Sequence, residues 1–353
     1  MKRILVTGVG SGGHGEQVLK ALSLAATGKY VLFGADANPH TRSKFVATKV
    51  HALPLANSPH YKDAVFELAR ELGVDAVFHG SEPELAVLSK MKDKFERAGI
   101  FLATNKPDLV EIGLNKDLTC RTLKELGFQV PRFWLITEGT ALDVVDEYPV
   151  VVKPYLGGGG SRDVFIAQNF RDLEAIALLL GFFDIPCDLF VQKYVGSADA
   201  EFTVGVLNSP EGKLIGSVAM KRDLTSTLSV RSRIPNRTSD LSLGEYLTVS
   251  SGVSQGRIDD FPEVRREAEL IAQRLGSAGP LNIQCRVVDK RIYVFEINPR
   301  FSGTTSARAL VGFNEPDLFL DSYFSPKELP GAFKIARGIL SRNLTESLEL
   351  LET

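Results

Sequence analysis

The first 112 residues alternate short apolar runs with amphipathic stretches, and this alternation constrains the fold more than any other feature of the sequence. The apolar runs at 4–6, 30–33, 76–78 and 100–102 are typical of buried parallel strands. Helical periodicity lies between and after them, at 16–25, 61–72 and 83–97. Strands that alternate with helices predict a parallel, doubly wound sheet. We therefore expect a Rossmann-like leading domain.

After residue 112 the pattern changes to a region rich in strands. A helix over 115–130 is closed by Gly127, and two further helices are expected over 262–275, with an N-cap near Asp259 or Asp260, and over 315–323. Predicted strands cover 132–136, 150–152, 164–166, 189–191, 202–206, 214–218 and two segments within 281–298. The expected fold class is α/β followed by α+β with antiparallel sheets.

The composition excludes several classes of protein. The chain has 353 residues, 44% of them apolar and 24% charged, and a formal net charge of −2. This length suggests two or three compact units, and the near-neutral charge argues against nucleic acid or a membrane surface as partner. The start runs into a strand and no apolar run is long enough to span a bilayer, so we expect no signal peptide and no membrane segment. Three cysteines without CxxC spacing fit a reducing, cytoplasmic location and no structural metal.

The positions of the histidines restrict the chemistry. All five lie within the first 80 residues, so no Ser-His-Asp triad, Cys-His pair or histidine-bound zinc can form wholly within the rest of the chain. Chemistry performed by those later residues alone must use carboxylates, amides and cations.

A glycine loop follows the first predicted strand. Gly8, Gly10 and Gly13 match the pattern GxGxxG, and Asp36 ends the second predicted strand. Such a loop lets backbone amides approach a pyrophosphate while the acidic residue binds a ribose hydroxyl, as in NAD(P)-dependent oxidoreductases. Tight strand-to-helix turns in any doubly wound sheet also favour glycine, so packing alone is the other explanation.

A second glycine-rich segment carries a lysine. Lys153 follows the apolar strand at 150–152, and four consecutive glycines, 157–160, come before Ser161. Amides without side chains can surround phosphate oxygens, so this segment favours a triphosphate-binding loop over a flexible hairpin tip. Lys116, at the start of the helix over 115–130, is either a second cation for the phosphates or a solvated surface lysine.

The strands within 281–298 predict a hairpin with one apolar and one polar face. The register that gives a continuous apolar face has a three-residue connection, Asp289 to Arg291. It makes these apolar pairs: Ile283 with Ile297, Cys285 with Phe295 and Val287 with Tyr293. The opposite face then carries Asn282, Gln284, Glu296 and Asn298.

This polar face suits a hard divalent cation. A carboxylate beside amide oxygens can hold Mg²⁺ and leave positions for phosphate and water, whereas a solvated face more often carries Lys, Thr and Glu. Pro299 ends the strand and directs Arg300 outward, where a guanidinium can bind a transferring phosphoryl group.

Three motifs together resemble the ATP-grasp superfamily, and within it the carbamoyl phosphate synthetase large-subunit-like branch. They are Lys153 with its glycine loop, Phe190-Val191-Gln192-Lys193-Tyr194-Val195 followed by Glu201, and Asn282-Ile283-Gln284 with Glu296-Ile297-Asn298-Pro299-Arg300. The resemblance covers roughly residues 1–325, and in this family the leading domain usually binds no dinucleotide. It implies a pre-ATP-grasp domain at 1–112, a first lobe at 113–188, a second lobe at 189–325 and a C-terminal extension at 326–353.

The resemblance implies a role for each matching residue. The residues matching groups that contact ATP phosphates are Lys116 and Lys153, with Gly158, Gly159, Gly160 and Ser161 as the loop that closes over them. Those matching the adenine-binding hinge are Gln192, Lys193, Tyr194 and Val195, and Glu201 matches the carboxylate that binds ribose. Gln284, Glu296 and Asn298 match the ligands of one or two Mg²⁺ ions, which Mn²⁺ can replace. Arg300, beside the γ-phosphate, and Lys153 are the implied catalytic residues.

Two departures from the family pattern matter. Gln192 stands where the family often has an acid, although its amide oxygen can still accept from the adenine amino group. The chain also has one grasp unit, whereas the full carbamoyl phosphate synthetase large subunit uses two in tandem. Synthesis of carbamoyl phosphate by this chain alone is therefore not expected.

The leading hypothesis is an ATP- and Mg²⁺-dependent ligase that joins a small-molecule carboxylate to an amine through an acyl phosphate. Such catalysis needs positioning and charge stabilisation more than a proton-shuttling histidine. The alternatives are an NAD(P)-dependent oxidoreductase and an ATP-binding subunit of a split synthetase, and a homodimer is allowed. A cluster of cations either binds an anionic substrate or belongs to a solvated loop at 221–240; it consists of Lys221, Arg222, Arg231, Arg233 and Arg237.

Overall fold

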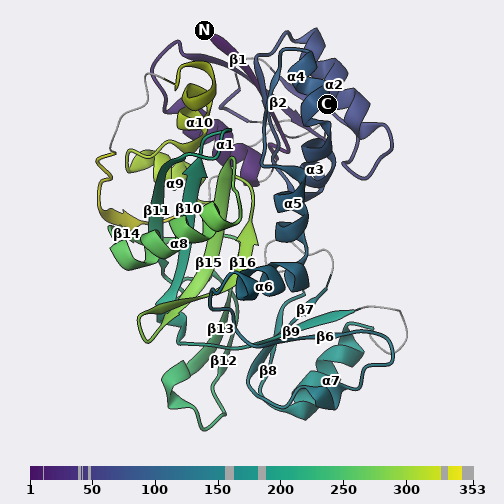
Figure 1. Ribbon diagram of the computed structural model, residues 1–353, viewed down its shortest axis with the longest axis vertical. Coiled ribbons are helices and arrows are strands. Elements are labelled where there is room, and N and C mark those ends of the chain that lie inside the picture. Colours follow the sequence, from purple (N-terminus) through teal and green to yellow (C-terminus); the bar gives the residue numbers. More distant parts are fainter. Residues whose placement is uncertain are drawn as a thin grey trace, which may run out of the picture.

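The sheets of the computed structural model divide where the sequence pattern changes. The structure describes residues 1–10, 12–38, 41, 43–46, 49–155, 163–181, 188–326 and 333–343. Within these residues, a five-stranded parallel sheet forms the leading domain. A four-stranded antiparallel sheet forms the first lobe, and a six-stranded antiparallel sheet with a two-stranded hairpin forms the second lobe. Figure 1 shows the leading domain at the top, the six-stranded sheet in the middle and the four-stranded sheet at the lower right.

The leading sheet has the strand order β3-β2-β1-β4-β5. Its strands are β1 (Lys2–Thr7), β2 (Tyr30–Asp36), β3 (Val50–Ala52), β4 (Ala76–Phe78) and β5 (Phe101–Ala103). Alternate side chains of β1 enter opposite cores, with Ile4 and Val6 on one face and Leu5 on the other, as expected for a strand covered on both faces. The predicted doubly wound sheet is confirmed, and β3 has no counterpart among the predicted strands.

Helices cover both faces of this sheet. They are α1 (His14–Ser23), α2 (Tyr61–Glu71), α3 (Glu82–Leu88) and α4 (Lys92–Arg97). The single helix predicted over 83–97 is interrupted by a 3₁₀ turn, η1 (Ser89–Met91), which lets Leu88, Met91 and Phe95 all enter one core. Two helices from the far end of the chain, α9 (Thr305–Leu310) and α10 (Glu315–Phe324), pack beside α1 (Figure 1).

Two helices connect the leading domain to the first lobe, α5 (Pro107–Leu114) and α6 (Lys116–Glu125). Asn115 lies between them, and its Oδ1 accepts a hydrogen bond from the Leu118 N–H at 2.9 Å. This bond caps α6. The cap therefore places Lys116 in the first turn of that helix.

The first lobe has the strand order β6-β9-β7-β8. Its elements are β6 (Phe133–Ile136), η2 (Leu142–Val144), β7 (Val150–Pro154), β8 (Phe165–Ala167), α7 (Phe170–Leu179) and β9 (Leu189–Lys193). Leu173 and Ala177 of α7 join the apolar core of this lobe. Because β9 pairs with both β6 and β7, strand pairing puts the lobe boundary after Lys193 rather than at 188.

The second lobe has the strand order β16-β15-β10-β11-β14-β17. Its sheet strands are β10 (Glu201–Asn208), β11 (Leu214–Arg222), β14 (Gly256–Asp259), β15 (Pro280–Val288), β16 (Arg291–Asn298) and β17 (Gly338–Leu340). The other elements are η3 (Ala198–Ala200), β12 (Val230–Pro235), η4 (Leu241–Leu243), β13 (Tyr246–Ser250) and α8 (Pro262–Arg274). Strand β17 belongs to the predicted C-terminal extension, so that segment completes the edge of this sheet.

Helix α8 begins differently from the prediction. Its N-cap is Phe261, in a left-handed conformation at φ 38°, and Pro262 follows at the first helical position. Proline suits that position, because no N–H is needed there. Asp259 pairs with Arg257 and Arg337 instead, and neither predicted aspartate caps the helix.

The hairpin of β15 and β16 confirms the predicted register at one end and contradicts it at the other. Asn282 pairs with Asn298, Ile283 with Ile297 and Gln284 with Glu296, as predicted. Beyond these pairs the register shifts, and Cys285 faces Val294 rather than Phe295.

The shift has its origin in the turn. The connection consists of Asp289 and Lys290, with φ of 49° and 64°, and Arg291 already pairs with Val288. The predicted three-residue connection is therefore wrong, because a two-residue turn with left-handed backbone matches the twist of a hairpin. Because the turn is one residue shorter than predicted, β16 has one extra residue, and Phe295 forms a bulge there. As a result, Val294 and Ile292 replace Phe295 and Tyr293 on the buried face.

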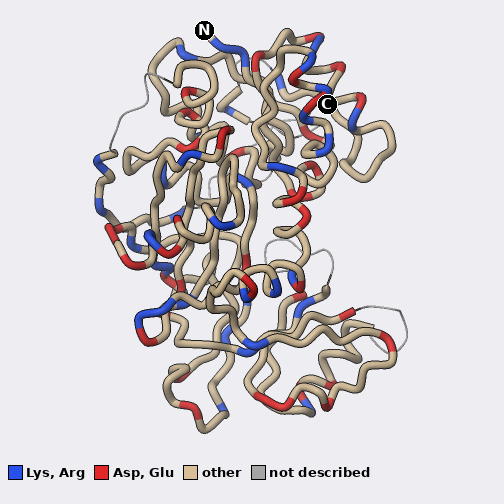
Figure 2. The backbone as a smooth tube through the Cα atoms, viewed as in Figure 1, with Lys and Arg blue, Asp and Glu red and all other residues tan. Residues whose placement is uncertain are grey.

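Charge is distributed evenly over the molecule. Figure 2 shows acidic and basic residues interspersed along the backbone of the leading domain and of both lobes. Among the described residues, no helix is both long enough and apolar enough to span a membrane.

Candidate active site

A large cavity opens where the leading domain and the two lobes meet. Its volume is about 990 Å³. It brings together most of the residues that the sequence motifs single out: Lys116, Lys153, Gln192, Lys193, Tyr194, Val195, Glu201, Gln284, Glu296, Asn298 and Arg300. The remaining predicted residues, Gly158, Gly159, Gly160 and Ser161, lie outside the described part of the chain.

Lys153 projects from β7 into this cavity, although only 8% of the residue is exposed. Its Nζ donates to Gln192 Oε1 at 3.2 Å and lies 5.7 Å from the ring centroid of Phe295. Burial lowers the pKa of Lys153, and the charge of Glu296 opposes that shift. A buried ammonium beside a neutral amide gains strongly from an incoming anion, because the surroundings screen its charge poorly.

Lys116 approaches the same cavity from the first turn of α6. Burial lowers the pKa of Lys116, while the carboxylates of Glu296 and Glu82 act in the opposite direction. These two carboxylates come from β16 and from α3, so Lys116 faces both the second lobe and the leading domain. It is part of the cavity wall rather than a solvated surface lysine.

The polar face of the β15–β16 hairpin lines the cavity, as predicted, with Asn282, Gln284, Glu296 and Asn298. Asn298 Nδ2 donates to Glu296 Oε1 at 2.8 Å. Asn282 is occupied within the protein, since its Oδ1 accepts from Thr203 Oγ1 at 3.0 Å and from Arg308 Nη2 at 2.7 Å.

The oxygen donors near Glu296 fit a magnesium ion that is shared with a phosphate. Gln284, Glu296 and Asn298 provide one carboxylate and two amide oxygens, which are hard ligands that leave positions open. The described residues contain no group of three or more His, Cys, Asp or Glu side chains that could hold a metal. An ion bound here would therefore depend on the amides and on its substrate.

The bulge in β16 brings Phe295 into the site, although the register prediction assigned this residue to the core. Phe295 and Glu296 are consecutive, and both line the cavity. An unbroken strand would send them to opposite faces. The one feature of the nearby sequence that favours the two-residue turn, and with it the bulge, is the Asp289-Lys290 pair, because aspartate tolerates the left-handed conformation.

Glu201 is buried between two arginines and is only 2% exposed. Its Oε1 accepts from Arg222 Nη1 at 3.2 Å, and its Oε2 accepts from Arg286 Nη2 at 3.0 Å. Arg286 also donates to the carbonyl oxygens of Val195 and Thr248. The three charged side chains therefore fasten the end of the predicted adenine hinge to β13, a role that its sequence motif does not reveal.

The cations of 221–240 contribute little to the cavity. Arg222 lines it, but Arg231, Arg233 and Arg237 are exposed on or beside β12. These three side chains are solvated, as that interpretation expects, but Arg231 and Arg233 lie on a strand rather than in a loop.

The leading domain closes one side of the cavity with residues that include Gly13, His14 and Glu82. Arg300 is only 6% exposed, and its Nη2 donates to Glu82 Oε1 at 2.7 Å and to Asn298 Oδ1 at 3.1 Å. It therefore bridges the second lobe and the leading domain instead of pointing to solvent. Because His14 reaches the cavity from α1, the absence of histidine from the later residues does not leave the assembled site without one.

Packing accounts for the first glycine loop. Asp36 Oδ2 accepts from the Gly10 N–H at 2.8 Å, so the carboxylate expected to bind ribose is bonded to the loop itself. Gly8 has a left-handed backbone at φ 59°, and a Cβ atom on it would lie 3.1 Å from the backbone of Gly80. Glycine is therefore needed at the end of β1 for the close approach of the segment that follows β4.

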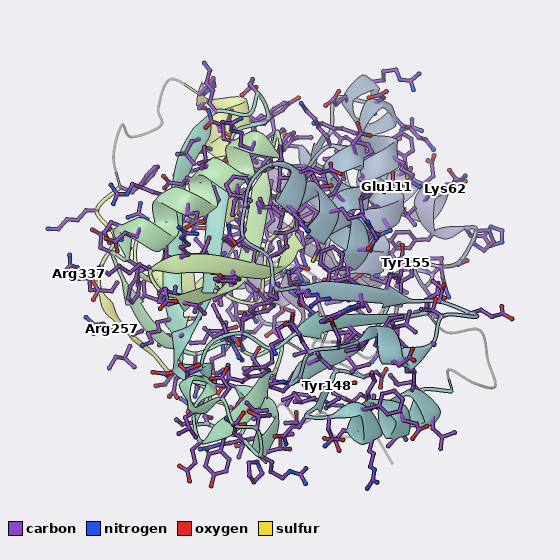
Figure 3. All side chains as sticks on the ribbon, turned by 60° about the horizontal axis from the view of Figure 1, so that its bottom comes forward. Lys62, Glu111, Tyr148, Tyr155, Arg257 and Arg337 are labelled. Atoms are coloured by element: carbon purple, nitrogen blue, oxygen red, sulfur yellow. The ribbon has the colours of Figure 1, made fainter. Side chains whose placement is uncertain are left out.

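The C-terminal extension fastens the loops at the edge of the cavity. Arg342 Nε donates to the carbonyl of Ser254 at 3.0 Å, its Nη1 donates to Gln17 Oε1 at 3.2 Å, and its Nη2 donates to the carbonyl of Gly303. Ser254 and Gly303 line the cavity. By contrast, Arg337 of the same segment projects from the outer edge of the sheet (Figure 3).

Comparisons with known proteins agree with this geometry. A family model described as PylC-like, N-terminal domain, matches residues 4–103, and one described as ATP-grasp in the biosynthetic pathway with Ter operon matches residues 248–339. The carbamoyl phosphate synthase large chain of Mycobacterium sp. (strain JLS) is 27% identical over 221 residues, which are 61% of this chain and 18% of that relative. The chain thus spans about a fifth of the relative's length.

Two solved structures share the fold. The N5-carboxyaminoimidazole ribonucleotide synthetase from Thermotoga maritima superposes with a TM-score of 0.58 and 19% identity, over 94% of this chain and 77% of that one. The D-alanine–D-alanine ligase from Bacillus anthracis, complexed with ATP, superposes with a TM-score of 0.58 and 17% identity, over 93% of this chain and 99% of that one. The ATP-grasp family match and the related sequences agree with the resemblance that the motifs predicted, and the two ligase structures share the fold of this chain.

Proposed function

We propose that the chain is an ATP- and Mg²⁺-dependent ligase that activates a small-molecule carboxylate as an acyl phosphate for attack by an amine. The observation that carries this proposal is the convergence of Lys116, Lys153 and Glu296 on one cavity of about 990 Å³. That volume lies at the upper end of the usual range for ligand sites. It leaves room for a nucleotide and a second small molecule together. The likeness to a ligase whose solved structure contains ATP supports the proposal.

Each part of the cavity has a role in this reaction. The ammonium groups of Lys116 and Lys153 bind phosphate oxygens, and residues 192–195 bind adenine. Arg300, held by Glu82 and Asn298, stabilises charge on the transferring phosphoryl group. Gln284, Glu296 and Asn298 would hold one or two Mg²⁺ ions, which neutralise phosphate charge when bound and which Mn²⁺ can replace. Glu201 holds the hinge in place through its two arginines.

The two other functions considered from the sequence make different predictions for ligand binding. A nicotinamide site would need Asp36 free to bind ribose, and this carboxylate is bonded to Gly10 and to the Asn38 N–H. An ATP-binding subunit of a split synthetase would use the same cavity and would bind Mg²⁺-ATP without turning it over. Binding and turnover must therefore be measured separately.

Thermal unfolding measures binding. Mg²⁺-ATP at about 100 times its Kd should stabilise the chain by about 2.7 kcal/mol, and NADH should not. Glu296→Gln should lose the Mg²⁺-dependent part of this stabilisation, whereas Glu263→Gln, an exposed carboxylate on α8, should retain it. Stabilisation by NADH without stabilisation by Mg²⁺-ATP would exclude the ligase.

Turnover is measured with carboxylates offered singly. The proteinogenic amino acids and short organic acids are mixed with Mg²⁺-ATP and hydroxylamine, and acyl hydroxamate and ADP are assayed. At least one carboxylate should give both products. Stabilisation by Mg²⁺-ATP with no hydroxamate from any carboxylate would point instead to the split-synthetase subunit.

A further inference from the structure

The leading domain contributes to the cavity a group that the phosphate-binding roles do not use. His14 is the first residue of α1 and lines the cavity next to Gly13. Arg300 lines the same cavity. Arg300 is the residue that the proposed function places beside the transferring phosphoryl group. His14 and the place where the acyl phosphate would form therefore belong to one cavity.

The second half of such a reaction needs a proton acceptor. An amine attacks an acyl carbon through its free electron pair, yet aliphatic amines are largely ammonium ions at neutral pH. The acidic residues of the described cavity wall are Glu82, Glu201 and Glu296. Each is already engaged: Glu82 with Arg300, Glu201 with two arginines, and Glu296 with Asn298 and the nearby lysines.

Among the described residues that line the cavity, His14 is the one histidine. Its surroundings favour the neutral imidazole ring. Burial, the charge of Arg300 and the neighbouring His79 all lower the pKa of His14. The positive end of the α1 dipole acts in the same direction, because His14 occupies the first turn. Arg300 comes from the segment after β16 and His79 from the segment after β4. A neutral imidazole has a free electron pair with which it can accept a proton.

We propose that His14 accepts the proton of the attacking amine during acyl transfer, an inference that rests on the proposed ligase function. The bound R′NH₃⁺ gives one proton to the unprotonated ring nitrogen of His14. The freed electron pair forms the N–C bond to the acyl carbon, and the C–O bond breaks with its electrons on the departing phosphate. A second proton passes from nitrogen to that phosphate. The products are an amide, hydrogen phosphate and an imidazolium that returns its proton to water.

The test compares two amines in the full chain. Hydroxylamine is largely unprotonated at neutral pH and needs no base, whereas the proteinogenic amino acids, offered singly as the amine, do. With a carboxylate that the wild type accepts, His14→Asn should keep its hydroxamate rate within about twofold. Its amide formation with an amino acid at pH 7 should fall by about 100-fold or more, within the range for loss of a general base.

The pH profile and a matched control complete the design. The remaining amide formation by His14→Asn should rise tenfold per pH unit, since it depends on free amine, while the wild-type rate should be nearly flat around neutral pH. His60→Asn replaces an exposed histidine at the start of α2 and should behave as wild type. Stabilisation by Mg²⁺-ATP shows that each variant is folded, and His14→Gln replaces His14→Asn if the latter fails that check.

Equal losses with both amines, or no loss with either, would overturn the role of His14 and leave the ligase function intact. Absence of hydroxamate from the wild type itself would overturn the ligase function, and this inference with it. The wild-type reaction thus separates the two failures.

Discussion

Replacing Glu201 with Gln should destabilise the chain even when no nucleotide is present. Glu201 is 2% exposed, and the arginines that it holds, Arg222 and Arg286, are 4% and 5% exposed. The substitution leaves two guanidinium groups buried without a counter-charge. Removal of one partner from a buried ion pair costs about 3–5 kcal/mol, and the lower end applies here because the glutamine oxygen can still accept a hydrogen bond.

This energy converts to a measurable shift of the melting temperature. Unfolding entropy is roughly 2.1 cal/mol/K per residue, or about 0.7 kcal/mol/K for a chain of 353 residues. A loss of about 3 kcal/mol then lowers Tm by about 4 °C if the chain unfolds as one unit, and by more if the second lobe unfolds first. Circular dichroism without ligand measures this shift, with Glu263→Gln as the exposed control.

The salt dependence of the Tm shift distinguishes a structural role of Glu201 from a role in nucleotide binding alone. The shift should persist at high salt, because buried charges are screened much less than surface charges. A Glu201→Gln variant that melts within about 1 °C of wild type, yet binds Mg²⁺-ATP weakly, would refute the structural role argued for this ion pair.

Two further predictions concern stability and the edge of the cavity. Burial and a neighbouring guanidinium hold the pKa of His79 at about 4, against about 6.5 in the unfolded chain. Between these values the unfolded state binds a proton that the folded state does not, so the unfolding free energy should fall by up to about 3 kcal/mol as pH drops from 6.5 to 4. Urea titrations should show that the unfolding free energy of His79→Gln falls less steeply with decreasing pH than that of the wild type. An equally steep fall would contradict this prediction. Arg342→Gln should speed amide exchange at 252–255 and 302–304, whereas Arg337→Gln on the exposed outer edge should not (Figure 3); equal exchange in both variants would contradict the fastening role.

Local patterns in the sequence were sufficient for most strands of the leading sheet and for one face of the site. The alternation of strands and helices predicts the doubly wound sheet, because each period reflects which side of a single element is buried. The same reasoning places Glu296 and Asn298 on one side of a strand, opposite Gln284, and the cavity confirms that placement. These inferences succeed because they concern residues close together in the chain.

The register beyond Gln284 depends on whether the turn has two or three residues, and the alternation of apolar residues does not predict the length of the turn. A two-residue turn at Asp289 with a bulge at Phe295 puts Val294 and Ile292 in the core, where the simpler pairing would put Phe295 and Tyr293. The twist of the hairpin decides between them. Phe295 therefore lines the cavity, although Ile297, its neighbour in the alternating pattern, is in the core.

The tertiary structure alone decided which distant groups complete the site. Arg300 and Glu82 are 218 positions apart, and the partners of Glu201 come from two other strands of the sheet. His14 enters the cavity from the start of α1, directly after a glycine loop that by itself suggests a different kind of nucleotide site. Contacts of this kind arise from how the sheets and helices pack against one another. They leave no periodic trace in the segments that make them, because a single long-range contact does not follow the repeat of a helix or a strand.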